Sequence, residues 1–336
     1  MNNFLKILSV PASWLYGAGV GIRNALYDSH LLHTSDAPMP AICVGNLAVG
    51  GTGKTPMVEY LVRLLSPRYK VAVLSRGYKR VTHGFLLADH NATAGTIGDE
   101  PMQLHRKFPN VVVAVCGERL IGMKRLKQAF PDLQVVILDD AFQHRRIRCG
   151  LNILLTSADS LYVDDTFLPH GRLRDAKRQS HRADIVVVTK CPKGIKPIEK
   201  RLIDTRLNLP TYQSLYFSTI VYPPIEAQGR AMLLTAVARP EYLEAQLKTV
   251  YPELVTLAYP DHHKLTASEL RFVEQKAKYY DMVYTTEKDL VRLEQAALSD
   301  ALREKLTPVA IETEIAEHET FDRQILTYVH ENARHT

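Results

Sequence analysis

The residues with the most specific chemistry lie in one glycine-rich stretch, Ala48-Val-Gly-Gly-Thr-Gly-Lys-Thr. This spacing is typical of a phosphate-binding loop, here with alanine in the first glycine position. Glycines let backbone N–H groups curl around phosphate oxygens, Lys54 can neutralise β- and γ-phosphates, and the Thr55 hydroxyl can bind Mg²⁺ at a helix N-terminus. A chance glycine-rich turn is the alternative, and the apolar strand before the stretch and the helical pattern after it argue against that alternative.

Two pairs of acidic residues could complete a phosphate-handling site. Asp139 and Asp140 end an apolar run, as in a Walker B segment, where a strand-end aspartate holds Mg²⁺ directly or through water. A pair of turn-forming aspartates is the alternative. Asp99 and Glu100 precede Pro101 and a helical stretch, which helix capping and the helix dipole would explain. The functional interpretation is a carboxylate that accepts a proton from an attacking hydroxyl.

Charged and histidine-containing segments follow later in the chain. Residues 170–182 hold a single acid, Asp175, and five cations, namely Arg172, Arg174, Lys177, Arg178 and Arg182. Such a run suits a solvated face or an anionic headgroup, and it suits nucleic acid less because no aromatic residues alternate with the cations. Asp261-His262-His263 could orient a base, although surface histidines are commoner, and Thr286-Glu-Lys-Asp289 has the spacing of a helix cap.

The elements that must position these residues follow a regular pattern. Short apolar runs alternate with stretches of helical period, which predicts an α/β fold of P-loop NTPase type, a parallel sheet flanked by helices. A helix with Val58, Leu61 and Leu65 on one face follows the phosphate-binding loop. The predicted strands are 41–44, 71–75, 111–115, 135–138, 152–155 and 184–189, followed by 231–236, 254–258, 282–285 and 308–311.

Composition excludes several classes of protein. The chain has 336 residues, 46% of them hydrophobic and 23% charged, so collagen-like, low-complexity and mainly disordered states are excluded. A net charge of +6 permits an anionic partner without choosing one. The 4 cysteines form no CxxC pair, which argues against a disulfide scaffold and a structural zinc site.

The N-terminal segment differs from the rest of the chain. Residues 7–22 carry no charge, but the run is shorter than the roughly 20 residues of a membrane span and is interrupted by Pro11 and three glycines. It is either a helix in a membrane interface, with Trp14 and Tyr16 at headgroup level, or a helix that covers a core. We expect this helix over 1–30, a P-loop domain over 31–212, a linker over 213–230 and a smaller α/β lobe over 231–336.

Taken together, these residues resemble the tetraacyldisaccharide 4'-kinase family, the lipid A 4'-kinases, over nearly the whole chain. The motifs that carry the resemblance are Tyr16-Gly17, Arg23, Tyr27-Asp28, Gly45-Asn-Leu, Val49-Gly-Gly-Thr-Gly-Lys-Thr-Pro56, Leu74-Ser-Arg-Gly-Tyr78, Gly98-Asp-Glu-Pro101, Asp139-Asp140, Phe142-Gln-His144, Pro169, Gly171, Leu173-Arg174, Asp261-His262 and Thr286-Glu-Lys-Asp289. The chain departs from the family pattern at Lys79, Ala141, Asp175 and Ala176, where Gly, Gly, Glu and Pro are expected. The first two departures matter if those positions need a positive φ.

The resemblance implies a kinase that moves the γ-phosphate of ATP, with Mg²⁺, to the 4'-hydroxyl of a tetraacylated glucosamine disaccharide 1-phosphate. This step of lipid A synthesis would occur on the cytoplasmic face of the bacterial inner membrane, where the chain would be a peripheral protein and a monomer, with no nucleic acid as partner.

The same resemblance implies roles for individual residues. The catalytic residues would be Asp99 as general base, His262 as its partner, and Lys54. The ATP site would be Ala48, Val49, Gly50, Gly51, Thr52, Gly53, Lys54 and Thr55, the metal ligands Thr55, Glu100, Asp139 and Asp140, and the substrate contacts Asn46, Arg76, Gln143, His144, Arg172 and Arg174.

The main alternative is a P-loop regulatory NTPase that acts as a switch at the membrane. Val49 stands where partitioning-type ATPases carry a signature lysine, and Thr189-Lys-Cys-Pro lacks the aspartate of a guanine-reading element, so both details weaken this alternative. A membrane scaffold with a vestigial nucleotide site is weaker still, because the loop lysine, the hydroxyl and the strand-end acids are all present.

Overall fold

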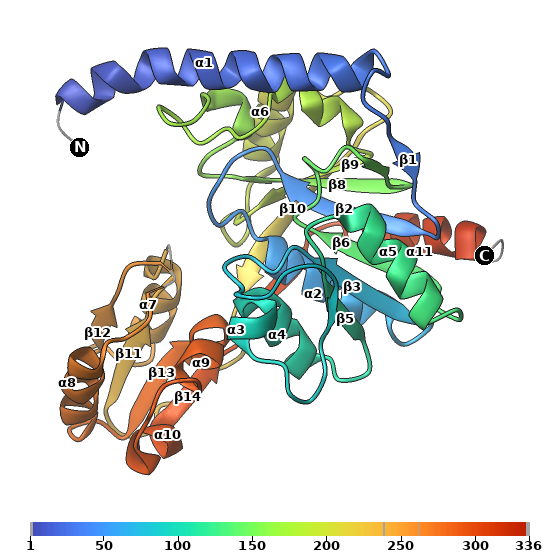
Figure 1. Cartoon of the computed structure of the whole chain (residues 1–336). Helices are drawn as coiled ribbons and strands as arrows, with labels where there is room; N and C mark the ends of the chain where they lie inside the picture. The colour runs from blue at the N-terminus through green and yellow to red at the C-terminus, as the bar shows by residue number, and fades with distance from the viewer. Residues whose placement is uncertain (1–2, 238, 262, 334–336) are drawn as a thin grey trace.

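The computed structural model describes residues 3–237, 239–261 and 263–333. Within them, the main sheet has the strand order β15-β10-β9-β8-β2-β6-β3-β5-β4, with seven parallel strands between antiparallel edge strands β15 and β4 (Figure 1). The strands are β2 (Ala41–Asn46), β3 (Val71–Ser75), β4 (Leu86–Leu87), β5 (Val112–Val115), β6 (Val135–Asp139), β8 (Leu151–Ser157), β9 (Ile185–Thr189), β10 (Ser214–Val221) and β15 (Glu312–Ile315). A separate pair is formed by β1 (Ser35–Asp36) and β7 (Ile147–Arg148). The predicted α/β fold is confirmed.

Helices cover both faces of this sheet because successive strand residues point to opposite sides. Ile42 and Val44 join the core under α2 (Lys54–Leu65) and α11 (His318–Ala333), while Cys43 joins the core on the other face. That other face is covered by α5 (Arg119–Ala129) and α6 (Pro197–Leu207). The short helices α3 (Ala94–Ile97) and α4 (Asp99–Lys107) precede β5, and the 3₁₀ turns η1 (Tyr162–Asp164) and η2 (Lys177–Arg182) lie between β8 and β9.

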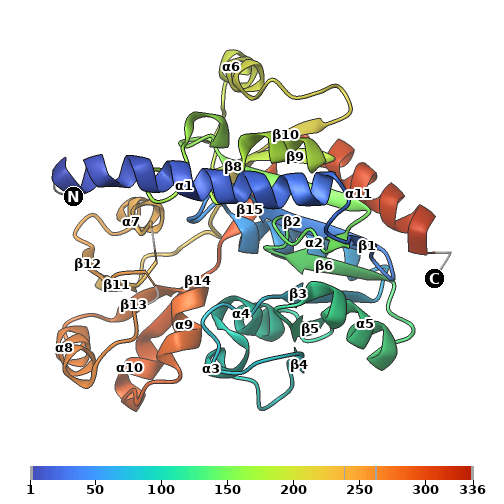
Figure 2. The ribbon, with the colours of Figure 1, turned by 45° about the horizontal axis from the view of Figure 1, so that its top comes forward.

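A second, smaller α/β lobe lies at the lower left of the molecule in Figures 1 and 2. Its four parallel strands have the order β12-β11-β13-β14. They are β11 (Ala231–Thr235), β12 (Val255–Ala258), β13 (Met282–Thr286) and β14 (Leu306–Val309), joined by α7 (Glu241–Lys248), α8 (Ala267–Ala277), α9 (Glu287–Leu293) and α10 (Asp300–Lys305). The lobe has its own cores on the two faces of its sheet.

The expected domain boundaries need correction. The segment expected as a linker over 213–230 begins with β10, which pairs in parallel with β9 of the main sheet. The expected lobe over 231–336 contains β15, which pairs antiparallel with β10, and α11, whose Phe321, Ile325 and Val329 are fully buried against the main sheet. The second lobe is therefore an insertion between β10 and β15, and the chain returns to the large domain after it.

The N-terminal segment forms one long helix, α1 (Asn3–Asp28), which continues through Pro11. It runs across the top of the large domain in Figure 1. No helix in the described part of the chain has the length and hydropathy of a transmembrane span.

Candidate active site

The glycine-rich stretch forms a loop between β2 and α2, as predicted. Gly50 and Gly53 have φ of 109° and 83°, a region that only glycine occupies readily, so these two positions need glycine. Neighbouring segments bind the loop, because Val49 N donates to the Arg172 carbonyl at 2.8 Å and the Thr189 hydroxyl donates to the Thr52 carbonyl at 2.9 Å. The backbone N–H groups and the N-terminus of α2 thus form a cradle for phosphate.

The Lys54 amine lies 3.8 Å from a carboxylate oxygen of Asp140, the residue after β6. Arg174 donates two hydrogen bonds to this carboxylate, one of them at 3.1 Å. Arg174 also donates to the side-chain oxygen of Asn46. Burial alone would raise the pKa of Asp140, but Lys54 and Arg174 outweigh it and hold the pKa at about 2. The site therefore keeps an ionised carboxylate between two cations at the mouth of the phosphate-binding loop.

Asp139 is buried at the end of β6. One of its oxygens accepts a hydrogen bond from Ser75 at 3.0 Å, and the other has no hydrogen-bond partner among the described residues. Burial, followed by the charges of Glu100 and Asp140, raises the pKa of Asp139 to about 7. A divalent cation would relieve both the orphaned oxygen and the mutual repulsion, so these carboxylates fit a Mg²⁺ site.

No group of three or more His, Cys, Asp or Glu side chains gathers as a metal cage in the residues that the structure describes. That finding is compatible with Mg²⁺, which usually takes one or two protein carboxylates together with nucleotide phosphates and water. Glu100 accepts from the Lys288 amine of the second lobe at 3.1 Å.

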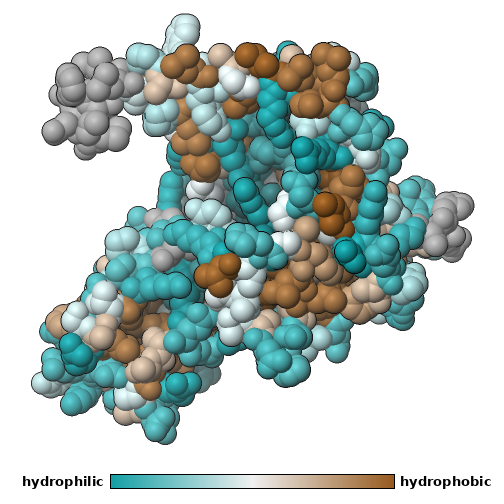
Figure 3. Space-filling view, in the orientation of Figure 1, coloured by the Kyte–Doolittle hydropathy of each residue, from teal (hydrophilic) through white to brown (hydrophobic). Residues whose placement is uncertain are grey.

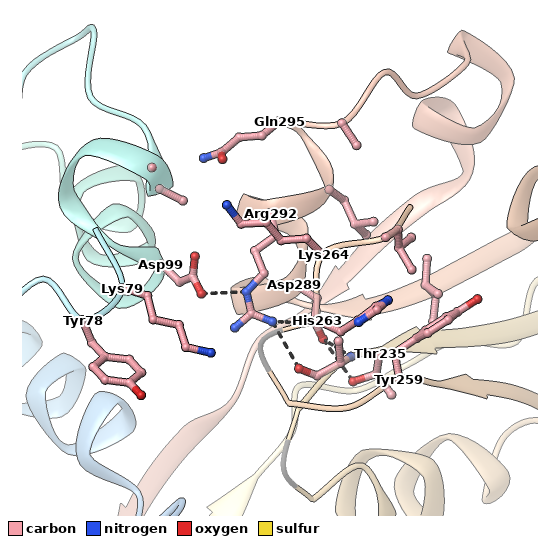
Figure 4. Close-up of a pocket in the computed structure, with 17 residues that line it drawn as sticks. Tyr78, Lys79, Asp99, Thr235, Tyr259, His263, Lys264, Asp289, Arg292 and Gln295 are labelled. Carbon is pink, nitrogen blue, oxygen red and sulfur yellow. Dashed lines mark hydrogen bonds and ion pairs between the residues drawn. The ribbon is translucent and has the colours of Figure 1, made fainter. Parts of the chain in front are cut away.

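Asp99 begins α4 and lies at the junction of the two lobes. Its Oδ2 accepts from Arg292 Nε at 2.6 Å, and the same guanidinium donates to Asp289 at 2.9 Å. Figure 4 shows the Asp99 carboxylate in contact with Arg292, and both residues line a cavity of about 250 Å³. His262, the predicted partner of Asp99, lies outside the described residues. The neighbouring His263 bonds Glu269 at 2.9 Å and stacks on Tyr259 with 5.3 Å between ring centroids.

Four of the predicted substrate residues lie together beside the phosphate-binding loop. Asn46 donates to the Thr52 hydroxyl at 2.6 Å and accepts from Arg174, and Gln143 donates to the Asn46 carbonyl at 2.7 Å. Arg172 lines a second cavity of about 110 Å³ over the loop and pairs with Asp165 at 3.0 Å. These residues surround the place where phosphate groups would bind.

The other two predicted substrate residues lie elsewhere. Arg76 is exposed just after β3. His144 Nε2 accepts from the backbone N–H of Arg119 at 3.2 Å, at the start of α5. Burial, followed by the charge of Arg119, lowers the pKa of His144 to about 4, so it is neutral at pH 7. Its position is that of a helix-capping acceptor.

Sequence reasoning missed two arginines of this region. Arg119 is buried and donates to the carbonyls of Cys116 at 2.6 Å and Asp139 at 3.0 Å, which places its charge behind the two strand-end acids. Arg292 reaches Asp99 from the second lobe. Arg119 has no motif around it, and Arg292 lies three residues beyond the Thr286-Glu-Lys-Asp289 motif, which indicated only a helix cap. The packing of the chain therefore shows the relation of each arginine to the site.

The departures from the family pattern have different structural contexts. Lys79 has φ of 60°, the left-handed region, whereas Ala141 is not among the residues with positive φ and is buried without needing glycine. Asp175 is buried, and its carboxylate accepts from the Asn24 side chain of α1 at 2.7 Å and from the backbone N–H of Ala176 at 2.8 Å.

The comparisons with known proteins agree on one family. Residues 5–330 match the family model described as tetraacyldisaccharide-1-P 4'-kinase. A tetraacyldisaccharide 4'-kinase of Bacteroides fragilis (strain YCH46) is 42% identical over 350 residues, which cover 96% of this chain and 93% of the relative. One of Flavobacterium johnsoniae is 42% identical over 343 residues, covering 98% and 99% of the two chains.

A solved structure is similar over the same length. LpxK from Aquifex aeolicus, crystallised in complex with ATP, superposes with a TM-score of 0.75 and 26% identity, and the match covers 97% of this chain and 99% of that one. The family match, the sequence relatives and the shared fold show that this chain belongs to the tetraacyldisaccharide 4'-kinase family.

Proposed function

We propose that this chain transfers the γ-phosphoryl group of ATP to the 4'-hydroxyl of a tetraacyldisaccharide 1-phosphate. The observation that carries this proposal is the placement of Lys54 and Asp140, 3.8 Å apart, at the mouth of a phosphate-binding loop in a chain of this family. The intact loop lysine, Thr55 and strand-end acids support phosphate transfer to an acceptor.

The roles of the side chains follow from their charges and positions. Lys54 and the N–H groups of residues 48–55 would stabilise negative charge on the transferred phosphoryl group. Thr55, Glu100, Asp139 and Asp140 would hold Mg²⁺, which neutralises phosphate charge when it is bound. Asp99 would accept the proton of the attacking hydroxyl, because it is a carboxylate that faces a cavity large enough for part of an acceptor.

The outer side of α1 supports a place for this chain on the cytoplasmic face of the inner membrane. Trp14, Leu15 and Ile22 are 78%, 77% and 63% exposed, and Figure 3 shows hydrophobic residues along the upper edge of the molecule, over α1. The inner side is held to the protein, since Ser13 donates to the Phe167 carbonyl at 2.8 Å and Asn24 bonds Asp175. A helix with one docked side and one apolar exposed side suits a peripheral position in a lipid interface.

The deciding experiment compares ATP turnover with and without the lipid acceptor in detergent micelles. Strong dependence on the lipid, with phosphate recovered on the acceptor, is the expected result. The variant Lys54→Ala is expected to lose at least about 100-fold in turnover, because one electrostatic contact with the transferred group is removed. ATP hydrolysis that is independent of lipid would support a regulatory NTPase instead.

A further inference from the structure

The cavity beside Asp99 contains two lysines, one from each lobe. Lys79 comes from the turn after β3, and Lys264 comes from the segment between β12 and α8. Both side chains are exposed. Among the described residues, neither amine has a hydrogen bond or an ion pair, and the ring of Tyr78, 5.7 Å from the Lys79 nitrogen, is the aromatic contact of Lys79.

The acidic residues of the cavity already have cationic or hydrogen-bonding partners. Asp99 accepts from Arg292, and Asp289 accepts from Arg292, from the Thr235 hydroxyl at 3.0 Å and from the Thr286 hydroxyl at 2.8 Å. The two lysine charges are therefore left to attract a ligand of opposite charge.

The backbone of Lys79 gives a second reason to assign it a role. Its φ of 60° is disfavoured for a residue with a Cβ atom, and the family pattern has glycine at this position. Strain of this kind gathers at functional sites. Gly98, the residue before Asp99, packs closely against this turn, because a Cβ added to Gly98 would lie only 3.1 Å from the Tyr78 carbonyl oxygen. Figure 4 shows the Lys79 side chain extending into the space between the lobes.

We infer that Lys79 and Lys264 form a phosphate subsite beside Asp99, an inference that rests on the proposed kinase function. The phosphate could be the 1-phosphate of the lipid acceptor or the terminal phosphate of ATP. None of the residues 48–55 lines this cavity, which favours the acceptor. The subsite would hold the acceptor by its anionic group while its hydroxyl lies near Asp99.

The test compares the wild-type chain with Lys79→Asn, which removes the charge and tolerates the left-handed conformation, and with Lys79→Arg, which keeps the charge. Two acceptors are used, the tetraacyldisaccharide 1-phosphate and the same disaccharide without its phosphate. Lys79→Asn is expected to raise KM for the phosphorylated acceptor about tenfold, as the loss of a charge-assisted contact would, with KM for ATP unchanged. Lys79→Arg is expected to keep the wild-type KM for the phosphorylated acceptor. For the dephosphorylated acceptor, Lys79→Asn and the wild-type chain should have the same KM.

The control variant is Lys276→Gln, since Lys276 is also an exposed lysine over an aromatic ring, 5.6 Å from Phe272, but lies on α8 outside the cavity. It should leave both KM values unchanged. Lys264→Gln should raise KM for the phosphorylated acceptor as well, and the double variant should be less impaired than the product of the two single effects, because both lysines hold one group.

A rise in KM for ATP with both acceptors would support the subsite and identify ATP as the source of its phosphate. Unchanged KM values for ATP and for the acceptor in a folded Lys79→Asn variant would overturn the inference while leaving the kinase function intact. Absence of lipid-dependent turnover in the wild-type chain would contradict the proposed function and not the subsite. In that case, equilibrium binding of the phosphorylated acceptor without ATP gives the same comparison of wild type and variant. Equal binding by the wild-type and Lys79→Asn chains in that assay would also overturn the inference.

Discussion

Arg292 donates from Nε to Asp99 Oδ2 over 2.6 Å, although 193 residues separate them in the chain. Asp99 begins α4 in the large domain, and Arg292 lies on α9 in the inserted lobe. Both side chains are largely shielded from solvent, with 18% and 7% exposed, so water screens their attraction less than that of a surface ion pair. The position of the second lobe therefore determines the surroundings of the proposed general base.

The first prediction concerns this contact. Arg292→Ala removes the cation shared by Asp99 and Asp289, so it is expected to lower kcat by about 10- to 100-fold while KM for ATP stays within about twofold. Arg292→Lys should retain more activity because it keeps the charge but loses the planar fork of donors. Arg271→Ala, at an exposed position on α8, is the matched control. An unchanged kcat in Arg292→Ala would show that the contact only joins the lobes.

A second prediction is that Asp99 and His262 act together. Asp99→Asn keeps the shape of the side chain but removes the proton acceptor, so kcat should fall steeply while nucleotide binding is retained. His262→Ala should also lower kcat, by less if it only orients the carboxylate. The double variant should be hardly worse than Asp99→Asn, because a partner does not help a missing base. Single-turnover kinetics measure the cycle, and independent, multiplicative losses would contradict a dyad.

The third prediction tests α1 without removing it, because deletion would also remove the Ser13 and Asn24 contacts that hold the loop around Asp175. Replacing Trp14, Leu15 and Ile22 together by Gln is expected to reduce co-sedimentation with anionic lipid vesicles and to raise KM for the lipid acceptor, since exposed apolar area drives interfacial binding. The melting temperature of the triple variant should equal that of the wild type.

The control for α1 is Phe272→Gln on α8, which removes an exposed aromatic residue, 45% accessible, from the second lobe. It should leave vesicle binding unchanged. Full co-sedimentation of the folded triple variant would mean that membrane contact is made by another part of the protein.

The fourth prediction concerns pH. The folded chain holds the pKa of His144 at about 4, below the ordinary value of 6.5, so the unfolded chain binds more protons between these two pH values. This residue therefore makes the folded state lose stability as pH falls from about 6.5 to about 4. His144→Gln keeps an acceptor for the Arg119 N–H but does not titrate, so its free energy of unfolding should depend less on pH in this window than that of the wild type.

Denaturant unfolding at a series of pH values measures the difference between the two proteins. His318→Gln, at an exposed position at the start of α11, is the control and should follow the wild-type curve. Parallel curves for His144→Gln and the wild type would contradict a buried neutral role for His144.

Most of the strands were predictable because each is locally distinct. A buried parallel strand is a continuous apolar run, and 71–75 was predicted at the bounds that β3 has in the structure. The strand predicted at 308–311 lies at Leu306–Val309 instead, because Pro308 and polar neighbours interrupt the apolar run of this strand. The edge strand β15, Glu-Thr-Glu-Ile, was not predicted, because it has a single buried side chain, Ile315, and is defined by its partner β10.

The phosphate-binding loop was determined by the sequence alone, since its glycines, lysine and threonine are contiguous and need only the strand before them and the helix after them. The strand-end acids Asp139 and Asp140 were determined in the same way, because the carboxyl ends of neighbouring parallel strands meet at one edge of a sheet.

The tertiary structure alone decided how the second lobe is placed and what it brings to Asp99. The return of the chain through β15 and α11 makes that lobe an insertion, held at both ends by the large domain. Its helix α9 therefore carries Arg292 to Asp99, and its segment after β12 carries Lys264 to the same cavity as Lys79. Contacts between residues so far apart depend on the packing of two separate cores, and no local pattern of side chains encodes that packing.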